Sequence, residues 1–181
     1  MQQRFSLFWA TLSVIALCAS GCGGETETSS GGDTGGATCF DYTKFDGTTP
    51  MVSFKTDVLP LFRNSCGVGG ASCHGDPAAS KGQLYLGPQN SAPEPTQTEI
   101  DDIVAGFVGA SGVMAPNMKV VVAGDASKSY LMHKMDGTLK CADLTCGTAG
   151  CGQSMPTGGA LLSQAERDKV RRWIIQGATS N

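Results

Sequence analysis

The chain has 181 residues, a formal net charge of −3 at pH 7, 8 Cys and only 2 His. This near-neutral charge gives no electrostatic basis for nucleic-acid binding, which requires a basic surface. Two His exclude metal sites that need three imidazole ligands. Eight Cys are unusual in a reduced cytosolic protein and favour export, disulfide bridges, a bound metal or a covalent cofactor.

The first 21 residues have the pattern of a lipoprotein signal peptide. Residues 1–4 hold one positive charge, and residues 5–19 are almost wholly apolar. A stretch of about 15 residues is too short for a membrane span, which needs about 20, but it suits a secretory signal. Small residues then precede Cys22, as in the bacterial lipobox. We therefore expect a lipid on the Cys22 thiol; the alternative is an ordinary cleaved signal in which Cys22 has no role.

Residues 22–37 are predicted to be the lipidated Cys and a flexible linker, and residues 38–181 a single folded domain. The linker is made of small, polar and acidic residues and lacks any large apolar side chain, so it cannot form a core. The domain is long enough to bury one hydrophobic core. We expect it to be anchored at the cell envelope, on the outer membrane facing the periplasm.

Four helices are predicted in this domain, over residues 52–65, 96–108, 126–136 and 163–176. Three of them show apolar residues at helical spacing. These are Phe54, Val58, Leu61 and Phe62; Ile100, Ile103, Val104 and Phe107; and Ala165, Val170, Trp173 and Ile174. Capping boxes are predicted at Thr96 with Glu99 and at Ser163 with Glu166. Asp125 is a further expected cap, Gly177 an expected helix stop, and Pro60 is expected to bend the first helix or move its start.

Long loops, residues 66–95 and 137–160, join these helices and are rich in Gly, Pro, Ser and Ala. The first loop contains one short apolar stretch, residues 84–86. Long loops in a small domain are usually functional or wrapped around something. The fold class is therefore a mainly α, small helical domain with long loops, held together by disulfides or by a cofactor in its centre.

The dipeptide Cys73-His74, with Cys66 upstream after a helix, suggests covalent haem attachment. The usual spacing is Cys-x-x-Cys-His, because thiols one helical turn apart reach the two vinyl groups while the imidazole meets the iron. Here six residues separate the thiols. Two arrangements are open: the Gly-rich insert bulges while both thiols reach the haem, or Cys73 alone holds the porphyrin.

Met155 is the expected second axial ligand, because a thioether favours ferrous iron and raises the reduction potential. It lies in a Gly-rich loop before the last helix. The competing thioethers are Met114, Met118, Met132 and Met135. His133 is an alternative ligand for a bis-His haem, although such a residue more often serves the packing of its helix.

The order of these motifs resembles the c-type cytochrome domains of bacterial exported proteins. The similar segments are SCGVGGASCHG, LYLG, VVAGDASKSYLMHKMDG and MPTGGALLSQAERDKVRRWIIQGA. They cover nearly all of residues 52–178, and residues 155–178 are the most specific. The resemblance implies a cytochrome c-like fold in which the first and last helices cross. It also implies one covalent haem c on Cys66 and Cys73, with His74 as the proximal and Met155 as the distal ligand of the iron.

The function implied by this resemblance is one-electron transfer between redox partner proteins of the cell envelope, without catalysis by side chains, so the protein is not expected to be an enzyme. The membrane is a partner through the lipid anchor, and nucleic acid is not. The alternative is a haem-free envelope lipoprotein acting as a structural or interaction module. In that case Cys66 and Cys73 would form a small disulfide loop.

Four further cysteines remain, namely Cys39, Cys141, Cys146 and Cys151. In an exported protein they are expected to form two disulfides. Three pairings are possible and the sequence does not choose between them. We favour one bridge within residues 141–151, with Cys39 reaching the remaining partner. A zinc site is the rival interpretation, but the spacing is poor for it.

Overall fold

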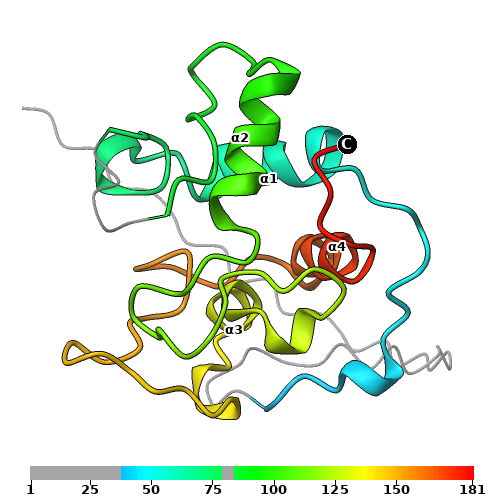
Figure 1. The fold of residues 1–181 in the computed structure, drawn as a ribbon, viewed down its shortest axis with the longest axis vertical. Helices are drawn as coiled ribbons and strands as arrows, with labels where there is room; N and C mark the ends of the chain where they lie inside the picture. Colours follow the sequence, from blue (N-terminus) through cyan, green and yellow to red (C-terminus); the bar gives the residue numbers. More distant parts are fainter. Residues whose placement is uncertain (1–37, 79–83) are drawn as a thin grey trace, which may run out of the picture. The chain divides into compact units, whose positions relative to one another are not determined.

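The computed structural model describes residues 38–78 and 84–181. The predicted signal peptide, Cys22 and the linker lie outside these residues. The described part is mainly helical, and its β-structure is confined to isolated bridges (Figure 1). Its α-helices are α1 (Leu59–Ser65), α2 (Gln97–Phe107), α3 (Tyr130–Asp136) and α4 (Gln164–Ile175). Shorter turns are η1 (Tyr42–Lys44), η2 (Phe54–Val58), η3 (Gly70–Ser72), η4 (Ala126–Lys128) and η5 (Leu139–Cys141).

The first predicted helix is divided between Val58 and Leu59, just before Pro60, into the π-helical turn η2 and the regular helix α1. Proline has no N–H to donate and its ring would clash with the carbonyl four residues earlier. The wide turn relieves this clash, because Leu59 N donates to the Phe54 carbonyl, five residues back. The expected effect of Pro60 is therefore confirmed.

Both predicted capping boxes are present, so α2 and α4 begin where the sequence indicates. The predicted helix over 126–136 differs, because η4 and α3 are separate. Ser129 between them is extended, and its hydroxyl donates to the Asp125 carbonyl and accepts from Val122 N. These side-chain bonds compete with the helical ones and break the helix.

Four aromatic rings form the centre of the core, where η2, α1, α2 and α4 meet. Phe54 lies 5.1 Å from Trp173 and 6.1 Å from Phe62, and Phe107 lies 5.9 Å from Trp173, measured between ring centroids. The predicted apolar positions of these helices are buried, except Ala165, which is exposed on the first turn of α4. The first and last helical segments are thus in direct contact.

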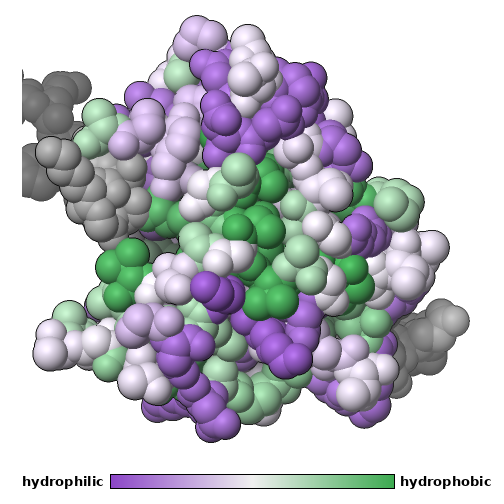
Figure 2. Space-filling view, viewed as in Figure 1, coloured by the Kyte–Doolittle hydropathy of each residue, from purple (hydrophilic) through white to green (hydrophobic). Residues whose placement is uncertain are grey.

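Two disulfides, Cys39–Cys141 and Cys146–Cys151, tie the loops together. The pairing favoured from the sequence is confirmed. On the face shown in Figure 2, hydrophobic residues gather around the C-terminal end of α2, with hydrophilic residues above and below them. None of the described helices is both long and apolar enough to cross a bilayer.

Replacing Phe107 with Ala tests the aromatic core. Loss of this fully buried ring should lower the free energy of unfolding by about 3–5 kcal/mol, because it leaves a cavity. Val113 is 68% exposed, so Val113→Ala is the matched control. It should change the free energy of unfolding by less than about 0.5 kcal/mol. Urea denaturation followed by Trp fluorescence measures both, and equal effects would contradict the assigned core.

Candidate functional site

The segment from Cys66 to His74 is a closed loop whose two ends are hydrogen-bonded to each other. His74 N donates to the Cys66 carbonyl at 3.0 Å. In a helical Cys-x-x-Cys-His motif the His N–H would point to this same carbonyl, four residues earlier. Here the bond spans eight residues, so the insert is extruded while the first Cys and the His keep their mutual contact.

The insert has internal hydrogen bonds of its own. Gly70 N donates to the Gly67 carbonyl at 2.9 Å, and Cys73 N to the Gly70 carbonyl at 3.1 Å. At the base, Gly75 packs so closely on Gly67 that a Cβ on Gly75 would overlap its backbone. Glycine at this close approach allows the two ends to meet. The insert between Cys66 and His74 therefore forms a bulge.

The His74 ring is held in one orientation and one tautomer by the apolar stretch 84–86. Its Nδ1 lies 2.5 Å from the Leu84 carbonyl oxygen, and Leu86 N donates to the His74 carbonyl at 3.0 Å. Because a carbonyl only accepts, Nδ1 holds a proton, and in the neutral ring the lone pair is then on Nε2. No hydrogen bond to Nε2 is found within residues 38–78 and 84–181. Metal-ligating His residues usually donate their other ring N–H to a carbonyl or carboxylate, and His74 makes this hydrogen bond.

Cys66 and Cys73, which precede this His, are free thiols, whereas the other four described cysteines are bridged. The Cys66–Cys73 disulfide of the haem-free alternative is thus not formed. Burial raises the pKa of the Cys66 thiol to about 12, and the nearby Cys73 adds to this shift. At neutral pH Cys66 therefore stays protonated, which slows its oxidation.

Met155 lies on a different loop from His74, before α4. It is half-buried, and its N–H donates to the Lys134 carbonyl of α3 at 2.9 Å. The disulfide Cys146–Cys151 ends shortly before it. The predicted distal ligand is therefore on a loop that is fastened to a helix and closed by a bridge.

The competing ligands are distinguished by their surroundings. Met132 and Met135 are almost fully buried within the core, whereas the Met114 sulfur packs against Gly152, beside the Met155 loop. His133 is 5% exposed, and both its ring nitrogens have partners: Nε2 donates to the Ser127 carbonyl at 3.0 Å, and Nδ1 lies 3.1 Å from the Thr138 hydroxyl. His133 therefore has a structural role.

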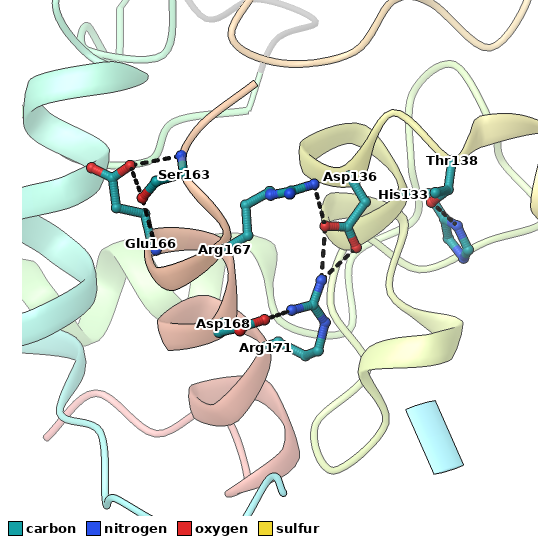
Figure 3. Close-up of polar contacts among 8 residues, drawn as sticks. All are labelled: His133, Asp136, Thr138, Ser163, Glu166, Arg167, Asp168 and Arg171. Atoms are coloured by element: carbon teal, nitrogen blue, oxygen red, sulfur yellow. Dashed lines mark hydrogen bonds and ion pairs between the residues drawn. The ribbon is translucent and has the colours of Figure 1, made fainter. Parts of the chain in front are cut away.

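A buried ion cluster, which the sequence analysis does not single out, joins α3 to α4 (Figure 3). The Arg171 guanidinium is 1% exposed and lies 2.7 Å from both carboxylate oxygens of Asp136. Arg167 also reaches Asp136, at 3.2 Å, and the Phe40 ring covers Arg171 with its centroid 3.6 Å away. The local sequence pattern that could have indicated this cluster is the i,i+3 spacing of Asp168 and Arg171, which form an ion pair.

No protein-family model, curated protein or solved structure matches the chain. Among residues 38–78 and 84–181, no three His, Cys, Asp or Glu side chains converge in a way that would hold a metal ion.

The reactivity of Cys66 tests the geometry of the loop. In the protein without an attached porphyrin, raising the thiol pKa to about 12 lowers the thiolate fraction at pH 8. Alkylation by iodoacetamide should be slower than in the unfolded chain by roughly a hundredfold or more, because the thiolate is the nucleophile. Time-resolved peptide mass spectrometry measures this rate. Equal rates in the folded and guanidinium-unfolded protein would show that Cys66 is not held in this environment.

Proposed function

We propose that the protein is a lipid-anchored c-type cytochrome that transfers single electrons between redox partner proteins of the cell envelope. The observation that supports this most strongly is the state of His74. Its Nδ1 proton is held by the Leu84 carbonyl, its Nε2 has no hydrogen-bond partner among the described residues, and two free thiols, Cys66 and Cys73, precede it in the sequence. These are the donor groups that covalent haem attachment requires.

The donor set fits a haem c in its chemistry. The thiols of Cys66 and Cys73 would each add S–H across a vinyl double bond, sulfur bonding to one carbon and hydrogen to the other, with no net loss of electrons. His74 Nε2 would bind the iron on one side. The hydrogen bond from His74 Nδ1–H to the Leu84 carbonyl would make the imidazole a stronger ligand. The Met155 thioether would hold the other side and favour the ferrous state. When bound, the haem supplies an iron that accepts and returns one electron.

The cysteine pattern supports a location in an oxidising compartment of the envelope. Four described cysteines form disulfides, which persist outside the cytosol. A lipid on Cys22 would then hold the domain at the outer membrane, facing the periplasm, through the linker 22–37. The partners are other redox proteins, and the side chains of this chain position the haem without catalysing a reaction of their own.

Export of the full chain in a bacterium with haem-attachment machinery tests the proposal. We expect a red protein with a c-type absorption spectrum and the added mass of one haem. His74→Ala should abolish the native spectrum, because the iron loses its proximal ligand. His133→Gln is the matched control and should keep the native spectrum, since both ring nitrogens of His133 are already hydrogen-bonded to Ser127 and Thr138. A colourless protein without iron, in which Cys66 is oxidised to Cys73, would instead support the haem-free envelope module.

Replacing Met155 with Ala tests the distal ligand. Covalent attachment should remain, shown by an intact haem mass, while the reduction potential falls because the thioether no longer favours ferrous iron. Met51→Ala is the control, since Met51 is 74% exposed, and should leave the potential unchanged. Potentiometric titration measures both. An unchanged potential in Met155→Ala would show that Met155 is not the distal ligand, and Met114 would then be the next candidate.

A further inference from the structure

The segment that ends at Met155, residues 151–155, lies along one face of α3 and is bonded to it at three points. Tyr130 Oη donates to the Cys151 carbonyl at 2.5 Å, and Lys134 Nζ donates to the Gln153 carbonyl at 2.8 Å. Met155 N donates in turn to the Lys134 carbonyl at 2.9 Å. Every second residue of the segment is thus attached to the helix.

The donors on α3 and the acceptors on the segment are both regularly spaced. Tyr130 and Lys134 are four residues apart on one helix face, which is about 6 Å along the axis. The accepting carbonyls belong to Cys151 and Gln153, which are two residues apart with Gly152 between them. The two side chains therefore bind alternate carbonyls of the segment.

Lys134 is an unusual residue in this position because its side chain is buried. It is 7% exposed, and within the described part of the chain no carboxylate pairs with it. Its ammonium lies 5.4 Å from the Tyr130 ring centroid, and desolvation lowers its pKa. Burying an ammonium is costly unless it is hydrogen-bonded. Its bond to Gln153 therefore compensates for burial and couples this lysine to the Met155 segment.

Gly152 leaves the space that the Lys134 ammonium occupies. Its φ of +72° lies in the left-handed region, and a Cβ there would overlap Lys134 Nζ and crowd the Met114 sulfur. The segment is also closed by the disulfide Cys146–Cys151. The bridge secures its beginning, and α3 secures the four residues that follow.

We propose that Lys134 and Tyr130 are positioning residues that hold the Met155 segment in register on α3 and so present the Met155 sulfur to the iron. The part concerning the iron rests on the proposed function. The attachment of the segment to α3 stands on its own contacts and can be tested with or without haem.

Lys134→Met is the first test variant, because it keeps a long unbranched side chain but cannot donate to Gln153. Hydrogen exchange of the full chain, followed at the Met155 amide, should be at least tenfold faster than in the wild type. The control is Lys128→Met, which changes a lysine whose side chain is 74% exposed, and it should leave this rate unchanged. Unchanged exchange at Met155 in Lys134→Met would overturn the inference, whether or not the protein binds haem.

Tyr130→Phe is the second variant, and it also serves if Lys134→Met does not fold. It removes the hydrogen bond to the Cys151 carbonyl without changing the net charge. A changed spectrum or potential in the haem-loaded variant would therefore result from a displaced Met155 segment and not from an altered charge. We expect weakening of the absorption band of ferric iron bound to Met sulfur and a lower reduction potential, with the haem mass unchanged. A haem-loaded variant with the wild-type band and potential would overturn the positioning role. A wild-type protein that lacks haem would refute the proposed function, while the exchange experiment still tests the attachment.

Discussion

The hydrogen bond from His74 N to the Cys66 carbonyl brings together the two ends of an insert that would otherwise separate them. It depends on the contact between Gly67 and Gly75, where a Cβ on Gly75 would overlap the Gly67 backbone. Because the ends meet, the six residues between the thiols form a bulge outside the site. The unusual thiol spacing is therefore compatible with the proposed haem, and the position of His74 depends on this closure.

The scaffold behind the loop is held by contacts of two different kinds. Near α1, aromatic rings of η2, α2 and α4 pack together and bury a large apolar area. Two residues before Trp173 on α4, Arg171 forms a buried pair with Asp136 beneath Phe40. The disulfide Cys39–Cys141 ties the beginning of the described chain to the same region. The long loops are thereby attached to a rigid base, as a site built on loops requires.

The two proposed axial ligands are positioned by separate parts of this scaffold. His74 depends on the carbonyl of Leu84, and Met155 depends on the side chains of α3. Backbone groups thus hold the imidazole, whereas a buried lysine and a tyrosine hold the segment of the thioether. This division means that the distal side can be perturbed without loss of the proximal ligand.

The sequence by itself determined the starts of α2 and α4, the division of the first helix just before Pro60 and the mainly helical class. These features depend on caps, proline geometry and apolar periodicity, all of which act over a few residues. It also favoured the disulfide pairing, which the structure confirms. Only the tertiary structure decided that Nδ1 of His74 is held by Leu84, that both nitrogens of His133 have partners, and that Lys134 is bonded to the Met155 segment. Each of these contacts joins backbone or side-chain groups whose distance is set by folding, so no local pattern could indicate them.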